Sequence, residues 1–360
     1  MSVCRVRDRR GFLRRVVSNP TLRGVDVAAA RTALYPASLL YRAVVAAHRG
    51  VYALGLKRTR RLPVPVISIG NISTGGTGKT PVAEWVARWL HEQGRRPAIL
   101  SRGYGAKVSP GDEVLNDEAA ILRENLPVVL HLCSADRATA GRRAIAEHGA
   151  DVLVLDDGFQ HRRLHRDLDI VLVDALAPPH RDYLLPCGIL REPLFAIRKA
   201  HVVIVTRSDL ATPSELAEVC RVLRAVIAPE VPLILAAHRP VALELMGRGE
   251  TPAALRGRPV FVFCGIGNPE GFRRTLLQLG ADVRDMVVLP DHCTYGDRQL
   301  RELERLASGC GASLAVTTQK DAVKVRQRWQ GPPLGVLRVA LEIRQGRDAL
   351  EAALMAVIQR

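Results

Sequence analysis

The chain of 360 residues has a net charge of +16, is 48% hydrophobic and only 4% aromatic, and contains seven cysteines. This length supports a large core and two domains, and the odd number of scattered cysteines argues against a disulfide framework or a zinc site and favours a reducing compartment. Residues 1–61 hold fourteen Lys and Arg against two acids, so we expect this end of the molecule to contact an anionic surface.

The segment 26–56 has the pattern of an amphipathic helix. Arg31, Arg42 and Arg49 are spaced so that they lie within about 20° of one another on a helix, opposite a wide apolar face. Pro36 could divide the helix, and the arginines interrupt every apolar run long enough to span a membrane. A helix on an anionic bilayer and a helix packed on the domain fit this pattern equally well, whereas the scarcity of aromatic residues argues against nucleic acid.

A phosphate-binding loop is predicted at residues 70–81, GNISTGGTGKTP. It lies between the apolar run 64–69 and a helical pattern, which is the context that such a loop requires. The expected nucleotide-binding residues are Ser73, Thr74, Gly75, Gly76, Thr77, Gly78, Lys79 and Thr80. Lys79 would neutralise the β- and γ-phosphates of a nucleoside triphosphate, and Thr80 would contact its Mg²⁺. Ser73 departs from the usual pattern, which has glycine there.

Apolar runs alternate with helical patterns through the rest of the chain. The runs predict buried parallel strands at 97–100, 128–130, 152–155, 170–173 and 202–205. This rhythm indicates a doubly wound α/β sheet with sites at the carboxyl ends of its strands. A weaker series of runs follows a cluster of prolines near residue 230. We therefore expect three parts: a basic amphipathic segment 1–61, a P-loop domain 62–230 and a smaller α/β domain 231–360.

Candidate catalytic residues follow these strands. Asp156 and Asp157 come directly after the run 152–155, where a P-loop enzyme needs a carboxylate to hold Mg²⁺. Asp112 lies in a glycine-flanked loop and is a candidate general base, although a solvated loop acid is the commoner explanation for such a residue in isolation. The residues 206–209 have a weak similarity to a base-reading loop.

Two further candidates lie later in the chain. Arg191 and Glu192 are candidates for contacting a polar substrate, with a surface ion pair as the alternative. His292, expected at a strand end in the second domain, is a candidate for orienting a catalytic carboxylate, although a single histidine is more often structural.

Together these segments resemble the tetraacyldisaccharide 4'-kinase family, the lipid A 4'-kinases. The similar segments occur in family order over roughly residues 30–325 and are GNISTGGTGKTP, SRGYG, GDE, LDDGFQHRRLHRDLDIVLVD, LLPCGILREP, FCGIGNPEGF, PDHCTYGD and TTQKDAVK. Ser73 is itself typical of this family. Two features depart from it: Cys293 stands where members often have His or Tyr, and the segment between Gly105 and Gly111 is shorter than usual, which leaves the placement of Asp112 open.

The resemblance implies transfer of the γ-phosphate of ATP to the 4'-hydroxyl of a lipid A disaccharide 1-phosphate. The residues that it implies are Thr80, Asp156, Asp157 and Gln160 for Mg²⁺, Asp112 as base with His292 orienting it when the domains close, and His161, Arg191 and Glu192 for the substrate. A membrane-bound substrate favours the interfacial interpretation of segment 26–56. The expected partner is therefore an anionic membrane surface, at the cytoplasmic face of the inner membrane, rather than nucleic acid.

Two alternatives come from other classes of protein. A deviant P-loop ATPase that acts as a dimeric switch on membranes usually has a lysine at the position of Thr74. A nucleotide-binding scaffold would need neither a base such as Asp112 nor a histidine in the second domain.

Overall fold

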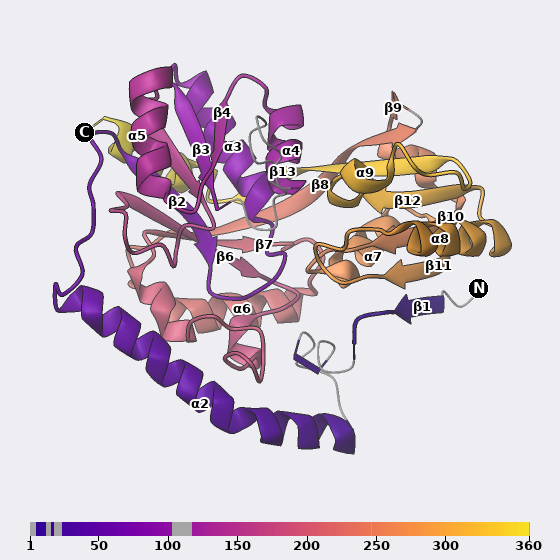
Figure 1. The fold of residues 1–360 in the computed structure, drawn as a ribbon, viewed down its shortest axis with the longest axis horizontal. Helices are drawn as coiled ribbons and strands as arrows, with labels where there is room; N and C mark the ends of the chain where they lie inside the picture. Colours follow the sequence, from indigo (N-terminus) through magenta and orange to yellow (C-terminus); the bar gives the residue numbers. More distant parts are fainter. Residues whose placement is uncertain (1–4, 12–15, 18–23, 103–116, 246, 360) are drawn as a thin grey trace. The chain divides into compact units, whose positions relative to one another are not determined.

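The computed structural model describes residues 5–11, 16–17, 24–102, 117–245 and 247–359, so the predicted base Asp112 lies outside the described residues. The chain divides into two compact units (Figure 1). The P-loop unit consists of Phe12–Ala237 and Leu341–Arg360, and the second unit of Met1–Gly11 and His238–Ala340. The chain passes from one unit to the other at residues 11–12 and, within two long strands, at residues 237–238 and 340–341.

The P-loop unit is built on a parallel sheet with the strand order β8-β7-β6-β2-β5-β3-β4. Its strands are β2 (Val66–Asn71), β3 (Pro97–Ser101), β4 (Leu130–Cys133), β5 (Val152–Asp156), β6 (Leu168–Asp174), β7 (Val202–Thr206) and β8 (Leu233–Leu245). Its α-helices are α2 (Val25–Ala53), α3 (Lys79–Glu92), α4 (Asp117–Asn125), α5 (Arg137–His148), α6 (Pro213–Arg224) and α10 (Arg347–Ile358), with 3₁₀ turns at Pro179–Arg181 and Leu194–Lys199.

Successive residues of these strands point to opposite faces of the sheet, and helices cover both faces. Ile170 and Leu172 belong to a core shared with α3 and α10, whereas Val171 and Val173 pack in a second core with α6. Because both faces are buried, the strands read as continuous apolar runs in the sequence. The predicted doubly wound α/β sheet is confirmed.

The second unit contains a smaller parallel sheet in the order β1-β11-β10-β12-β13. The bounds are β1 (Arg5–Asp8), β9 (Arg248–Glu250), β10 (Pro259–Cys264), β11 (Asp282–Val288), β12 (Leu314–Thr318) and β13 (Leu334–Gln345), with α7 (Pro269–Gln278), α8 (Asp297–Gly309), α9 (Gln319–Val325) and a 3₁₀ turn at Pro252–Leu255. Strand β9 pairs antiparallel with the end of β8. A second, smaller α/β fold is thus present, as predicted.

Both ends of the chain differ from the three-part division expected from the sequence. Strand β1, inside the basic segment 1–61, pairs with β11, and Arg7 forms an ion pair with Asp285 at 2.9 Å. Helix α10 carries Leu350 and Leu354 into the core of the P-loop unit rather than the second unit. Both differences arise from contacts between residues far apart in the sequence, which local patterns do not report.

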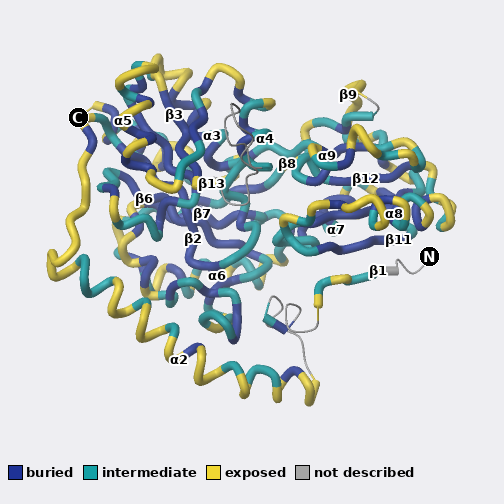
Figure 2. Tube along the Cα trace, viewed as in Figure 1, coloured by how far each residue is buried: buried dark blue, intermediate teal, exposed yellow. Residues whose placement is uncertain are grey.

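Helix α2 runs unbroken through Pro36 and packs on the P-loop unit along one side. The side chains that face the unit include Ser38, whose hydroxyl donates to Leu184 O at 2.9 Å, and Tyr41, whose hydroxyl donates to Arg191 O at 3.1 Å. The opposite side is exposed (Figure 2). Within the described parts of the chain, none of the helices combines the length and the apolarity needed to cross a bilayer.

Candidate active site

The loop between β2 and α3 has the geometry of a phosphate-binding loop. Gly75 and Gly78 have φ angles of 120° and 86°, which a side chain would disfavour, and Lys79 begins α3 directly after the loop. Asn71, the last residue of β2, donates to Thr77 Oγ1 at 2.9 Å and lies 3.4 Å from Ser73 Oγ. One side-chain amide therefore ties both ends of the loop together.

The opposite side of the loop contacts the segment that follows β6. Thr74 N donates to Ile189 O at 2.6 Å, and Arg191 N donates to Ile72 O at 2.7 Å. The segment that carries the predicted substrate residues is thus hydrogen-bonded directly to the phosphate-binding loop.

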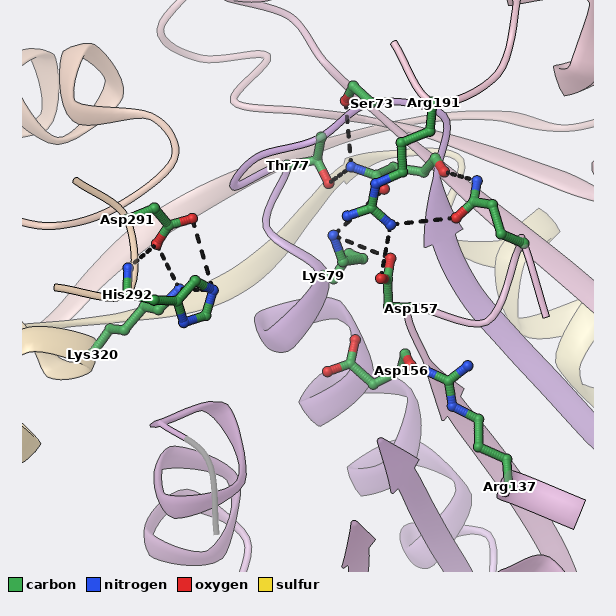
Figure 3. A network of polar contacts seen from close by, with 12 residues as sticks. Ser73, Thr77, Lys79, Arg137, Asp156, Asp157, Arg191, Asp291, His292 and Lys320 are labelled. Carbon is green, nitrogen blue, oxygen red and sulfur yellow. Dashed lines mark hydrogen bonds and ion pairs between the residues drawn. The ribbon is translucent and has the colours of Figure 1, made fainter. Parts of the chain in front are cut away.

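Lys79 lies among the polar side chains drawn in Figure 3. Its Nζ is 3.4 Å from Asn71 Oδ1 and 3.5 Å from Asp157 Oδ1. Arg191 donates from Nη1 to Asp157 Oδ2 at 2.8 Å and approaches Gln160 Oε1 at 3.4 Å. Burial alone would raise the pKa of Asp157, but Lys79 and Arg191 outweigh it and lower this pKa to about 2. Asp157 is therefore ionised and neutralised by two cations.

Asp156 has the opposite environment. Its carboxyl group is buried, and Oδ1 has no hydrogen-bond partner among the described residues. Burial, and next the negative charge of Glu118, raise the pKa of Asp156 to about 7. Arg137, itself buried, donates to the backbone oxygen of Asp156 at 3.1 Å rather than to its carboxylate.

A buried carboxylate oxygen without a partner fits a hard divalent cation. No group of three or more His, Cys, Asp or Glu side chains able to hold a metal occurs in the described part of the chain. A Mg²⁺ ion here would thus depend on phosphate oxygens, water and Thr80, the second residue of α3, in addition to Asp156.

The remaining predicted residues of this unit have distinct surroundings. Gln160 donates from its amide to Asn71 O at 2.8 Å, so it supports the start of the loop. His161 is half-buried, and burial together with Arg137 and Arg166 lowers its pKa to about 4, which keeps the imidazole neutral. Glu192 is buried and accepts from Arg162 at 3.0 Å.

The surface ion pair between Arg191 and Glu192, which was the alternative to substrate contact, is absent from the ion pairs of the described residues. Instead the two side chains bind different partners, because Arg191 reaches Asp157 while Glu192 pairs with Arg162 and lies 3.9 Å from Arg49 of α2. The segment 189–192 thus connects the phosphate-binding loop, the acidic pair and helix α2.

In the second unit, His292 follows β11 in a left-handed backbone conformation with a φ of 61°. Lys320 at the start of α9 donates to Asp291 Oδ1 at 2.8 Å, and its Nζ is 3.4 Å from His292 Nε2 (Figure 3). Within this unit, the three side chains form one cluster at the carboxyl ends of β11 and β12.

Sequence reasoning missed several residues that contribute to these clusters. They are Asn71, Arg137, Glu118 and Lys320. Two of them could have been found from the sequence, because Asn71 lies between the predicted strand and the loop glycines, and Lys320 lies in the TTQKDAVK segment that resembles the family. Asn71 acts within the loop itself, whereas the roles of Arg137, Glu118 and Lys320 depend on residues far away in the chain, which local sequence patterns do not report.

Comparisons with known proteins agree with this geometry. The family model described as tetraacyldisaccharide-1-P 4'-kinase matches residues 30–359. The chain belongs to this family. A tetraacyldisaccharide 4'-kinase of Anaeromyxobacter sp. (strain Fw109-5) is 43% identical over 89% of this chain and 90% of its own length, and one of Pelobacter propionicus is 38% identical over 86% and 88%.

A solved structure gives the same result. The crystal structure of the "apo" form of LpxK from Aquifex aeolicus in complex with ATP has a TM-score of 0.69 and 29% sequence identity, covering 91% of this chain and 99% of that one. The predicted family, the kinase activity that defines it and the α/β fold are therefore confirmed.

Proposed function

We propose that this kinase binds MgATP at the phosphate-binding loop and transfers the γ-phosphate to the 4'-hydroxyl of a lipid A disaccharide 1-phosphate. The observation that carries this proposal is the placement of Lys79 at the start of α3, beside an acidic pair whose members have opposite environments. Lys79 and the loop N–H groups would bind the phosphates, in a geometry that favours transfer by positioning and charge.

We assign direct contact with Mg²⁺ to Asp156 and Thr80, and an indirect role to Asp157 and Gln160. Asp157 already pairs with Lys79 and Arg191, whereas the Asp156 oxygen is buried without a partner. When bound, the metal would neutralise charge that develops on the transferred phosphoryl group. The protein contributes by burying the Asp156 carboxyl group and by keeping Asp157 ionised.

The lipid substrate would bind next to the segment 189–192. Arg191 is oriented by Asp157 and lies beside the phosphate-binding loop, so it can orient the acceptor sugar. His161 is neutral, and its Nε2 is buried without a hydrogen-bond partner among the described residues, so a sugar hydroxyl would reach it only after the side chains around it move. Glu192 would position Arg162 and Arg49 rather than meet the substrate itself.

The base that accepts the hydroxyl proton is proposed to be Asp112, oriented by His292 when the two units close on the substrate. One observation favours a second candidate, Glu118 in the first turn of α4, because its negative charge is near enough to Asp156 to raise the pKa of that carboxyl group.

Asp112→Asn and Glu118→Gln separate the two candidates. The variant that removes the true general base should lose about 10²- to 10⁴-fold in kcat, because a positioned base contributes that much to the rate. Its Kd for MgATP should stay within twofold of the parent. The other variant should retain parental turnover. Parental kcat in both variants would reject both assignments.

We also propose that helix α2 docks the enzyme on the anionic cytoplasmic face of the inner membrane, where its acyl-chain substrate resides. The exposed side of α2 carries Leu39, Leu40 and Val44. Four exposed basic residues follow it at Lys57, Arg58, Arg60 and Arg61. An apolar helix face next to basic side chains suits an anionic bilayer surface.

One assay separates the proposed kinase from the alternatives. ATP labelled at the γ-phosphate is supplied with a lipid A disaccharide 1-phosphate acceptor. Label on the lipid supports the proposal. Label released only as inorganic phosphate would support an ATPase switch, and label that stays on ATP would support a scaffold.

A further inference from the structure

Thr206, the last residue of β7, and Arg207, which follows it, both form hydrogen bonds to the backbone of the phosphate-binding loop. The Thr206 hydroxyl donates to Thr77 O at 2.9 Å, and Arg207 donates from Nη2 to Gly76 O at 2.7 Å. Two consecutive side chains thus bind two consecutive carbonyl groups of the loop. These residues begin the 206–209 segment, which the sequence suggested only as a weak base-reading motif.

The second amino group of the Arg207 guanidinium is also held in place. Its Nη1 forms an ion pair with Asp174, the last residue of β6, and the side chains of Arg207 and Asp174 are only 11% and 4% exposed. Asp174 and Thr206 are register partners in the sheet, so the β6–β7 edge determines where the guanidinium points. The planar guanidinium can bind Asp174 and Gly76 O at once.

The backbone at Arg207 is also unusual. Its φ of 55° is left-handed, a conformation that a non-glycine residue keeps only where its surroundings fix it. Thr206 has no exposed surface. The left-handed backbone at Arg207 and the burial of Thr206 place both side chains against the phosphate-binding loop, where each donates a hydrogen bond to a loop carbonyl group.

Binding the carbonyl groups fixes the N–H groups of the same peptides. The peptide bond is planar and trans, so its C=O and N–H point in opposite directions. With Thr77 O directed at Thr206, the N–H of Gly78 points away from the Thr206 hydroxyl, and the N–H of Thr77, in the peptide whose oxygen binds Arg207, donates to Gly75 O at 2.9 Å. The backbone of the loop is therefore held in one conformation before the nucleotide arrives, which reduces the ordering cost of binding.

We propose that Thr206 and Arg207, supported by Asp174, are positioning residues that hold the phosphate-binding loop in its nucleotide-receiving conformation. This inference rests on the proposed binding of MgATP at that loop. It assigns the 206–207 pair to the phosphates of the nucleotide and not to its base.

The test measures the Kd values of MgATP and of magnesium tripolyphosphate by calorimetry on the full chain. Arg207→Lys keeps a positive charge beside Asp174 but loses the guanidinium that binds Asp174 and Gly76 O at the same time. Asp174→Asn removes the negative charge but keeps an oxygen that can accept from Leu176 N, which now donates to Asp174 Oδ1 at 3.0 Å. Each should weaken both ligands by about tenfold to hundredfold, as expected for a lost hydrogen bond to a charged group. The KM for the lipid acceptor should stay within twofold.

Thr206→Val tests the neighbouring contact with a side chain of nearly the same shape, and it provides the answer should Arg207→Lys fail to fold. It should weaken both ligands about threefold to tenfold, because only a neutral hydrogen bond is lost. Arg181→Lys is the matched control, because Arg181 forms an exposed ion pair with Glu218. Its Kd values should equal those of the parent.

The outcomes separate this inference from the proposed function. A purely structural role would lower the fraction of binding-competent protein while leaving Kd unchanged, and that result would overturn the inference. Weaker MgATP with unchanged tripolyphosphate would also overturn it and would indicate base reading. A parent protein that binds neither ligand would refute the proposed nucleotide site itself.

Discussion

The phosphate-binding loop and helix α2 belong to the same unit but are held in opposite ways. The loop is contacted from several directions, by Asn71, by the segment 189–191 and by the end of β7. Among the described residues, helix α2 is contacted along one side only, and it leaves a row of large apolar side chains in solvent. A site that must bind charge in a fixed geometry is contacted from all these directions, whereas the surface that we propose meets a fluid bilayer would need only an exposed apolar face.

The strongest test of this comparison is Lys79→Met. We expect phosphate transfer to fall by about 10³-fold or more, because a fixed cation on the transferred phosphate contributes on that scale. Transfer of labelled phosphate from ATP to the lipid acceptor measures this loss. Arg143→Met, at an exposed ion pair of α5, should keep parental activity. More than a tenth of parental activity in Lys79→Met would contradict the role of this lysine.

The sequence predicted the loop well because its chemistry is local. Glycines, Lys79 and Thr80 lie within ten residues, and the flanking strand and helix follow from their own apolar patterns. Four of the five parallel strands were predicted in place for the same reason, since burial on both faces makes each a continuous apolar run, whereas β4 is Leu130–Cys133 and not 128–130, because Val128 lies in a turn and is 63% exposed.

The contacts that complete the site were not predicted. Asn71, Arg137 and Arg207 act through partners that are 6, 19 and 131 residues away in the chain. Helix α2 illustrates the same limit. The spacing predicted its arginine stripe, but only the structure shows that Arg49 turns inward, where it lies over the ring of Phe195 and near Glu192.

The double variant Leu40→Ser/Val44→Ser tests the membrane side of the comparison. These side chains are 68% and 58% exposed and lie one turn apart on the same face. Removing them should lower partitioning onto anionic vesicles by about tenfold or more, because each buried aliphatic side chain contributes roughly 1.5–3 kcal/mol when fully buried.

Vesicle flotation measures this effect, with MgATP affinity as the internal reference. Ala46→Ser is the matched control, since Ala46 is exposed on a different side of α2. Point substitutions are preferable to deleting residues 1–61, because that deletion would also remove β1 from the second unit. Unchanged flotation of the double variant, with the control equal to the parent, would remove α2 as the docking surface.

The smallest expected effect concerns stability and tests whether the contacts around the loop hold it without a ligand. In the folded protein the pKa of Asp157 is about 2, against an ordinary value of 3.8, so the unfolded chain binds its proton first as the pH falls. The stabilisation is therefore complete above about pH 4 and is lost as the pH falls through about 2. Arg191→Gln removes one of the cations that lower this pKa and should reduce the free energy of unfolding at pH 7 by on the order of 1 kcal/mol, with less loss on acidification. Urea unfolding of the nucleotide-free protein at pH 7 and pH 3 measures both quantities, and Arg143→Gln is the control. An identical pH dependence in Arg191→Gln and the parent would show that Arg191 does not stabilise the ionised Asp157.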